Sequence, residues 1–382
     1  MKIAGNDILI QSLINEGVEY IFGYPGGAAL HIYDSIFNQK EMQHILVRHE
    51  QGATHAADGY ARATGKPGVV LVTSGPGATN AITGIATAFM DSIPMVIISG
   101  QVQSHLIGTD AFQETDMIGV SRPIVKHSFT VDKQENIANI VAEAFHIATS
   151  GRQGPVLIDV PKDLTNPDDL FDFVYPDKVH VRSYNPPIKP ENHQVSRAVD
   201  AILASERPVI YAGGGTISSN ASKELRELND LIDAPVTNTL MGLGVFPGTH
   251  KRFLGMLGMH GTYQANMAMH NADLIIALGA RFDDRITNAP DKFAPRAKII
   301  HFDVDHSSVS KIIEADIAVF GQIKDSLQAI NNHLKTKIDE IDNEKLAPWH
   351  QQISDWKEKH GLNHDLYKIC LLYTSDAADD LV

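Results

Sequence analysis

Residues 45–62 of the chain have the sequence ILVRHEQGATHAADGYAR, in which an apolar run is followed by a carboxylate and then by small, helix-forming residues. This pattern predicts a strand at 45–47, a helix at 52–64 and Glu50 between them. Glu50 then lies at the carboxyl end of a strand, where open α/β sheets bind ligands. An acidic residue is also favoured at any helix start by the helix dipole, so Glu50 alone fits a purely structural role as well.

Two turns that contain glycine and proline lie on either side of Glu50 in the sequence. The first is FGYPGGA at 22–28 and the second is TSGPGATN at 73–80, and each follows an apolar run. Glycine lets the backbone approach a ligand closely, and proline stiffens the loop. We therefore expect three loops at the carboxyl ends of strands to line one crevice.

The rest of the chain alternates between strand-like and helix-like patterns. The continuous apolar run at 69–72 is typical of a strand that is buried on both faces. Further strands are expected at 20–22, 95–98, 156–160, 208–211, 235–237, 274–278 and 299–304. Strands spaced by helices favour parallel sheets, so the predicted fold class is α/β, with two doubly wound parallel-sheet domains.

The predicted domain organisation follows from composition. The first domain spans 1–170, and a proline-rich, polar linker at 171–192 leads to a second domain at 193–335. Residues 336–382 are expected to form a further linker and an atypical tail, which begins no convincing third domain.

Composition excludes several classes of protein. The net charge of −14 argues against a nucleic-acid partner, because phosphate binding needs clustered Lys and Arg. The only cysteine, Cys370, fits a reducing compartment. No apolar run is long enough to span a membrane, and the start resembles neither a signal nor a transit peptide. We therefore expect a cytoplasmic protein without a membrane partner.

The three loops, in this order, resemble the pyrimidine-binding domain of thiamine-diphosphate enzymes. Within that group the chain is most similar to the catalytic large subunits of acetolactate synthase, also called acetohydroxyacid synthase. The resemblance covers roughly residues 5–368. It implies a pyrimidine-binding first domain and a central FAD-binding second domain.

The resemblance assigns catalytic roles in the first domain. A carboxylate beside the aminopyrimidine ring of thiamine diphosphate favours the tautomer that the cofactor needs, and Glu50 matches it. Gly27 and Gln113 match positions that face the reacting atoms, and Lys162 matches a lysine at the active-site entrance. Tyr24, Pro25, Gly26, Asn80 and Phe112 match cofactor contacts. Without the resemblance, Gly26 and Gly27 also fit a tight turn, Asn80 a helix cap, Phe112 the core and Lys162 the solvent.

The resemblance also implies an FAD site in the second domain. The turn YAGGGT at 211–216 is similar to a dinucleotide-binding turn, although Ser218 replaces the last glycine of that pattern. The segments LGMHGT at 257–262 and GARFDDR at 279–285 are more specific. Arginines there can bind phosphate oxygens or flavin carbonyls, although a surface ion pair is the alternative role for residues 283–285. The implied FAD contacts are Arg152, Gly213, Gly214, Thr239, Leu240, Gly258, Met259, His260, Gly279, Arg281, Asp283, Arg285, Asp303, Val304 and Gln322. The family usually has an acid where Gln322 stands.

One part of the family pattern does not occur in the sequence. The family binds Mg²⁺ and the cofactor diphosphate through a Gly-Asp-Gly segment and a downstream Asn in a third domain, as a hard cation with oxygen ligands requires. No Gly-Asp-Gly occurs here, and the match fades near Cys370. No metal ligand is therefore assigned, and the chain is expected to be truncated and inactive alone.

The implied function is the decarboxylating condensation of pyruvate with a second 2-ketoacid, pyruvate or 2-ketobutyrate. The products would be 2-acetolactate or 2-aceto-2-hydroxybutyrate, in branched-chain amino-acid biosynthesis. The implied partners are a second copy or a tetramer and a regulatory small subunit. The alternatives are another thiamine-diphosphate enzyme, such as pyruvate oxidase, and, for this fragment alone, a non-catalytic flavin-binding module.

Overall fold

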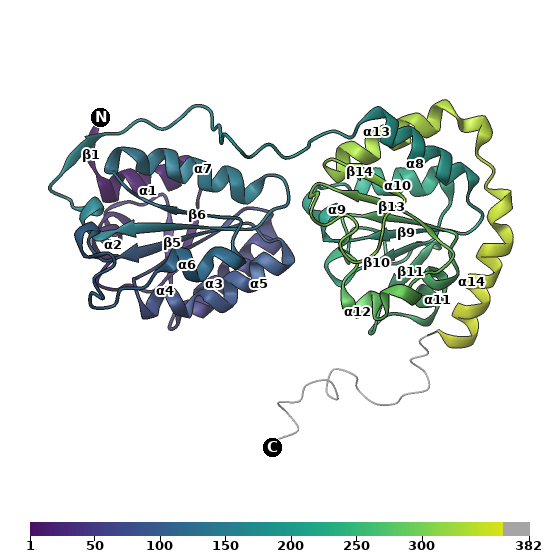
Figure 1. The fold of residues 1–382 in the computed structure, drawn as a ribbon, viewed down its shortest axis with the longest axis horizontal. Helices are drawn as coiled ribbons and strands as arrows, with labels where there is room; N and C mark the ends of the chain where they lie inside the picture. The colour runs from purple at the N-terminus through teal and green to yellow at the C-terminus, as the bar shows by residue number, and fades with distance from the viewer. Residues whose placement is uncertain (362–382) are drawn as a thin grey trace, which may run out of the picture. The chain divides into compact units, whose positions relative to one another are not determined.

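The computed structural model describes residues 1–361. The chain folds into two compact units. Unit 1 is Met1–Pro187, and unit 2 begins at Ile188. Each unit is a six-stranded, all-parallel sheet with helices on both faces (Figure 1). The predicted fold class is therefore confirmed. Cys370 and the predicted atypical tail lie outside the described residues.

Unit 1 has the strand order β3-β2-β4-β5-β7-β6. Helices α1, α2 and α7 cover the face whose core includes Leu71 and Ile98, and α3 packs with α5 on the other face. The sheet strands are β2 (Tyr20–Gly23), β3 (Gln43–Leu46), β4 (Gly68–Val72), β5 (Met95–Gln101), β6 (His127–Thr130) and β7 (Pro155–Pro161). The helices are α1 (Gly5–Asn15), α2 (Leu30–Asn38), α3 (Glu50–Thr64), α4 (Pro76–Asn80), α5 (Ile82–Asp91), α6 (Met117–Ser121) and α7 (Ile137–Thr149).

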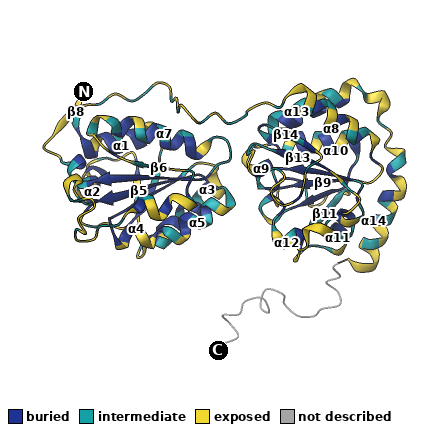
Figure 2. Ribbon diagram, viewed as in Figure 1, coloured by how far each residue is buried: buried dark blue, intermediate teal, exposed yellow. Residues whose placement is uncertain are grey.

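The centre of each sheet is buried on both faces, as the dark strands in Figure 2 show. All five residues of β4 are buried, in agreement with the apolar run at 69–72. Helix α3 packs closely against β4 at Gly68. A Cβ on Gly68 would lie 2.4 Å from the carbonyl oxygen of Ala57 on α3, so this close approach requires glycine. In contrast, β3 is an edge strand, and Leu46 is 65% exposed.

The segment that follows β7 packs against unit 1. Strand β8 (Leu170–Asp172) pairs antiparallel with β1 (Lys2–Ala4). Beyond it, Tyr175 donates a hydrogen bond to Glu16, and Tyr184 packs against the core. The boundary between the units at 187/188 falls inside the segment that the sequence assigns to a linker.

Unit 2 has the strand order β11-β10-β9-β12-β13-β14. Helices α8, α10 and α13 pack on one face, and α11 and α14 pack on the other. The strands are β9 (Pro208–Ala212), β10 (Val236–Asn238), β11 (Phe253–Met256), β12 (Leu274–Leu278), β13 (Lys298–Asp303) and β14 (Ile317–Phe320). The helices are α8 (Asn192–Ala204), α9 (Gly214–Ser218), α10 (Ser222–Ile232), α11 (Tyr263–Asn271), α12 (Asp284–Thr287), α13 (Ile323–Thr336) and α14 (Ala347–His360).

Residues 336–361 pack against unit 2 through α14. Trp349 is 2% exposed and its indole nitrogen donates to the Pro208 carbonyl oxygen at 3.2 Å. The Trp356 ring meets the Trp349 ring edge-on, with centroids 5.8 Å apart. Both tryptophans thus lie on a single helix, although the sequence assigns this segment to a linker.

Both strand orders contain a point where the chain reverses direction across the sheet. In unit 1 the chain moves outward from β2 to β3 and then returns to β4 on the other side of β2. In unit 2 it moves outward from β9 through β10 to β11 and returns to β12 beside β9. Ligands of open α/β sheets bind at the carboxyl ends of strands at such points. The two glycine-containing turns of unit 1 follow β2 and β4, so they meet where a ligand is expected.

Candidate active site in unit 1 and candidate flavin site in unit 2

Glu50 is the first residue of α3 and is buried, with 8% exposure. The side-chain amide of Asn80, the last residue of α4, donates to Glu50 Oε2 at 2.9 Å. The start of α3 favours the carboxylate through the helix dipole. A carboxylate has about four acceptor positions, so one amide leaves capacity for a ligand that donates a hydrogen bond.

The turn after β2 combines packed and open glycines. A Cβ on Gly26 would lie 2.4 Å from Thr73 Cγ2, so this glycine is required for packing. A Cβ on Gly27 would meet no atom within 4 Å, and Gly27 is exposed. The neighbouring Tyr24 is 43% exposed, and Pro25 is also exposed. Gly26 thus fits the structural alternative, whereas Gly27 presents open backbone.

The turn after β4 packs against both the turn after β2 and Glu50. The Thr73 hydroxyl accepts a hydrogen bond from Ala28 N at 3.2 Å, which ties the two turns together. A Cβ on Gly77 would lie 2.6 Å from Thr73 Cγ2 and 3.2 Å from Glu50 Oε1. Gly26, Thr73, Gly77 and Glu50 therefore form one continuous packed group.

The segment with Phe112 and Gln113 reaches the same place from β5. Gly75 has φ +60°, and a Cβ there would lie 2.5 Å from the Gln113 carbonyl oxygen. Gln113 itself has φ +59°, in the left-handed region. Phe112 is 86% exposed, which contradicts its alternative role in the core. Lys162 is the first residue after β7, on the same sheet edge, and is partly buried.

A polar pair near Glu50 is not among the residues predicted from the sequence. Tyr33 Oη lies 3.2 Å from His44 Nε2, and the rings meet edge-on. Burial, and secondarily the charge of Glu50, raises the pKa of Tyr33, and burial lowers the pKa of His44. Both groups are therefore neutral near pH 7. Nothing in the sequence pattern indicates this pair, because it depends on how α2 packs beside β3.

In unit 2 the glycines of the two central loops pack against each other. A Cβ on Gly213 would lie 2.2 Å from the Gly279 carbonyl oxygen, and one on Gly214 would lie 3.1 Å from Met241 Cβ. Gly279 has φ +56°, and its own Cβ would lie 2.6 Å from Gly215 Cα. These glycines let the loops after β9 and β12 approach closely at the point where the chain reverses direction.

The two more specific motifs of unit 2 are in contact. Met259 N donates to the Arg285 carbonyl oxygen at 2.9 Å, and a Cβ on Gly258 would lie 2.8 Å from the same atom. Arg281 pairs with Asp283 at 2.9 Å, and Asp283 also accepts from Arg285 N at 2.9 Å. That backbone hydrogen bond, together with Arg281, lowers the pKa of Asp283. Met259, His260, Arg281 and Arg285 are all exposed beside the glycine loops.

The remaining predicted flavin contacts occupy several positions. Thr239 lies just after β10, and its hydroxyl accepts from Gly242 N at 2.9 Å, while the neighbouring Leu240 is 69% exposed. Asp303 ends β13 and accepts from Asp305 N at 2.9 Å, and Val304 follows it. Gln322 accepts from the Ser219 hydroxyl at 3.3 Å. Arg152 belongs to unit 1, where its Nε donates to Ser92 Oγ at 2.8 Å.

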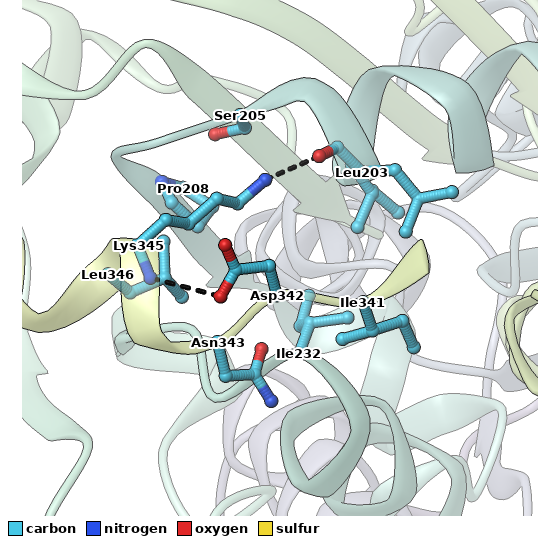
Figure 3. Close-up of a pocket in the computed structure, with 10 residues that line it drawn as sticks. Leu203, Ser205, Pro208, Ile232, Ile341, Asp342, Asn343, Lys345 and Leu346 are labelled. Atoms are coloured by element: carbon cyan, nitrogen blue, oxygen red, sulfur yellow. Dashed lines mark hydrogen bonds between the residues drawn. The ribbon is translucent and has the colours of Figure 1, made fainter. Parts of the chain in front are cut away.

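A small hollow in unit 2 does not involve any predicted site residue. It lies between α8, α10 and the 341–346 segment, and the side chains around it are shown in Figure 3. Pro208, which lines it, is the first residue of β9, so the hollow is near the amino end of that strand. The glycine loops follow the carboxyl ends of the strands, so we do not assign the hollow to the candidate site.

Neither a candidate metal cluster nor a membrane helix occurs within residues 1–361. The described part of the chain has no group of three or more His, Cys, Asp or Glu side chains that could hold a metal ion. Within the same range, no helix is long and apolar enough to cross a membrane.

Comparison with family models identifies both units. Residues 3–120 match the N-terminal, thiamine pyrophosphate-binding domain of thiamine pyrophosphate enzymes. Residues 195–330 match the central domain of the same enzymes. The fold and site therefore define the class as thiamine pyrophosphate enzymes.

Comparison with individual proteins narrows the class from thiamine pyrophosphate enzymes in general to one family of them. The chain is 55% identical to the acetolactate synthase large subunit of Buchnera aphidicola from Schizaphis graminum, over 95% of this chain and 63% of that protein. It is 52% identical to the Haemophilus influenzae large subunit, with the same shares covered. It is 50% identical to the Escherichia coli isozyme 3 large subunit, over 96% of this chain and 64% of that protein. The chain belongs to the acetolactate synthase large-subunit family, and it spans slightly less than two thirds of the length of these relatives.

Proposed function

We propose that this chain provides the pyrimidine-binding and central parts of an acetolactate synthase large subunit. The reaction is the transfer of a two-carbon unit from pyruvate, with loss of CO₂, to a second pyruvate or to 2-ketobutyrate. The products are 2-acetolactate and 2-aceto-2-hydroxybutyrate, precursors of valine, leucine and isoleucine. The observation that carries this proposal is the buried Glu50 carboxylate, with Asn80 Nδ2 at 2.9 Å, at the reversal point of unit 1.

The residues of unit 1 fit thiamine diphosphate. When bound, this cofactor supplies a nucleophilic carbon to which a ketoacid adds. Glu50 would accept a hydrogen bond from the pyrimidine ring and hold the proton that the two groups share. The Asn80 side-chain amide would keep the Glu50 carboxylate in position. Gly27 has open space where a side chain would stand, so its backbone can approach a ligand. We propose that Tyr24, Pro25, Phe112 and Gln113 border the same space and that Lys162 stands at its entrance.

For unit 2 we propose FAD as the ligand. Arg281 and Arg285 are exposed beside the glycine loops, and these loops are close enough for backbone contact with each other. Such an arrangement is suited to binding phosphate oxygens. The condensation is redox-neutral, so the flavin would serve the structure rather than carry net electrons. Arg152 remains a proposed contact from unit 1. For Mg²⁺ we assign no ligand within the described residues, because the resemblance places its ligands in a Gly-Asp-Gly domain.

The proposed partners follow from the relatives, which are described as large subunits. We propose a homodimer or tetramer, a regulatory small subunit and a cytoplasmic location. The names of these relatives favour the synthase over pyruvate oxidase.

The proposed function can be tested by product identity. Residues 1–361 would be joined to the part of the Escherichia coli isozyme 3 large subunit that this chain does not match. With pyruvate, thiamine diphosphate, Mg²⁺, FAD, inorganic phosphate and dissolved oxygen, we expect 2-acetolactate. Acetyl phosphate would support the oxidase, and absence of turnover from a folded, FAD-bound protein would contradict the proposal.

The 382-residue polypeptide alone is the matching comparison. We propose that it binds FAD without consuming pyruvate, because Gly-Asp-Gly is absent from its sequence. Acetolactate formation by this polypeptide alone would overturn that expectation.

A further inference from the structure

The loop between β5 and α6, residues 102–116, is held at both ends by one side chain. Gln101 is the last residue of β5 and is 3% exposed. Its Oε1 accepts from Val102 N at 2.9 Å, at the start of the loop. Its Nε2 donates to the Thr115 carbonyl oxygen at 2.9 Å, at the end of the loop. The two ends of the loop are therefore joined through the Gln101 carboxamide.

The same carboxamide is attached to the neighbouring strand. Gln101 Nε2 also donates to Asp159 Oδ2, on β7, at 3.0 Å. Asp159 is 3% exposed, and among the described residues its Oδ1 has no hydrogen-bond partner. Burial raises the pKa of Asp159 to about 7. Burying a carboxyl group with an unsatisfied oxygen costs folding free energy. We therefore expect Asp159 to have a role other than packing in this buried strand.

The loop is also braced internally. Glu114 accepts hydrogen bonds from Gly108 N and from Ala111 N, the latter at 2.9 Å. Ser104 N donates to Asp163 Oδ1 at 2.8 Å, which attaches the start of the loop to the segment just beyond β7. Because the Glu114 bonds hold the middle of the loop in one shape, its position depends on the attachments near its ends.

This braced loop carries the two residues that meet the candidate site. The Gln113 carbonyl lies against Gly75, close enough that a Cβ on Gly75 would stand 2.5 Å away. Phe112 is 86% exposed and therefore makes little contact that would fix its position. Both residues owe their placement to the loop backbone.

We propose that Gln101 and Asp159 are positioning residues for this site, because they anchor both ends of the 102–116 loop and so present Phe112 and Gln113 beside the Gly75 turn. The identity of the ligand there rests on the proposed function, whereas the anchoring rests on the hydrogen bonds alone. Neither residue is among those predicted from the sequence.

The test is hydrogen exchange of the full 382-residue chain, which needs no cofactor. Gln101→Leu removes all three hydrogen bonds, and we expect exchange in 102–116 to rise about tenfold or more while β4 and α7 are unchanged. The matched control is Gln103→Leu, the same change at an exposed position in the same loop, which should leave exchange unaffected. Equal exchange in both variants would overturn the proposal.

A pair of variants at Asp159 separates anchoring from general loss of packing. Asp159→Asn keeps an oxygen that can accept from Gln101 Nε2, so loop protection should be retained. Asp159→Ala removes the acceptor, so protection should fall in 102–116 alone. Equal protection in the two variants would contradict the role of Asp159, and this comparison also serves if Gln101→Leu fails to fold.

The joined protein used to test the proposed function then distinguishes the two ideas. If the anchor acts as proposed, Asp159→Ala should raise KM for pyruvate more than Asp159→Asn does. If loop exchange responds as expected but the joined protein makes no acetolactate, the anchoring holds and the proposed function fails. If loop exchange is unchanged in a protein that makes acetolactate, the proposed function holds and the anchoring fails.

Discussion

The Asn80 side-chain amide lies 2.9 Å from a carboxylate oxygen of Glu50, although the two residues are 30 positions apart. Glu50 begins α3 after the edge strand β3, whereas Asn80 ends α4 after the central strand β4. The pairing therefore joins the ends of two strands on either side of β2. It holds a buried acid where the topology of unit 1 directs a ligand.

The first prediction concerns this pair. Asn80→Ala leaves the buried Glu50 without its amide donor, so unit 1 should lose about 1–3 kcal/mol of unfolding free energy. Urea unfolding, with hydrogen exchange in α3, measures the loss. Asn136→Ala is the matched control, because Asn136 donates to Asp132 at the surface, and its change should stay within about 0.5 kcal/mol. Equal effects in the two variants would refute the special role of the Glu50–Asn80 bond.

Adjacent glycines provide the second prediction. Gly26→Ala would force a Cβ against Thr73 and should cost about 1–3 kcal/mol of stability. Gly27→Ala meets no atom within 4 Å and should change stability by less than about 0.5 kcal/mol. In the joined protein, however, Gly27→Ala should weaken pyruvate turnover, because the methyl group occupies the proposed ligand space. Normal turnover in Gly27→Ala would argue against that assignment.

The third prediction concerns pH. Burial raises the pKa of Asp159 from 3.8 to about 7, so between these values the folded chain binds a proton that the unfolded chain has lost. Stability should therefore fall as pH rises, by about 2 kcal/mol between pH 5.5 and 8 from this group. Asp159→Asn removes the titration. Urea unfolding at both pH values should show a smaller decrease in the variant, and an identical decrease would contradict the assignment.

The fourth prediction addresses the flavin. Arg281→Ala should weaken FAD binding by about tenfold or more if the guanidinium binds the cofactor, since charged hydrogen bonds are among the stronger ones. Stability should hardly change, because the Arg281–Asp283 pair is partly exposed. Fluorescence titration with FAD measures the affinity. Arg226→Ala, at an exposed arginine on α10, is the control, and an equal loss there would indicate a non-specific charge effect.

Much of the fold could be predicted because central strands have a distinct pattern. The apolar run at 69–72 is a buried strand, and strand–helix alternation indicates parallel sheets. Edge strands are less evident: β6 contains His127, Ser128 and Thr130, and β11 and β14 have only four residues each. Their pairing is decided by the neighbouring strand rather than by their own sequence. The same limit applies to β3, which is expected at 45–47 but covers Gln43–Leu46 as an exposed edge.

The candidate site divides in a similar way. The glycine turns and Glu50 are visible in the sequence because each follows a strand and has a recognisable local pattern. The Tyr33–His44 pair and the Gln101–Asp159 anchor have no such pattern. They depend on which strands and helices are neighbours in the folded chain, and that information is not local. Asp159 does leave one trace, a carboxylate inside an otherwise apolar strand.

The most direct test of the central claim is the rate of acetolactate formation by the joined protein with Glu50→Gln. Gln keeps the size of the side chain but cannot hold the proton, so the rate should fall at least about 100-fold. Glu19→Gln removes an exposed carboxylate paired with Lys66 and should leave the rate within about twofold. A Glu50→Gln protein that keeps most of its activity while binding thiamine diphosphate would show that Glu50 is not the catalytic carboxylate.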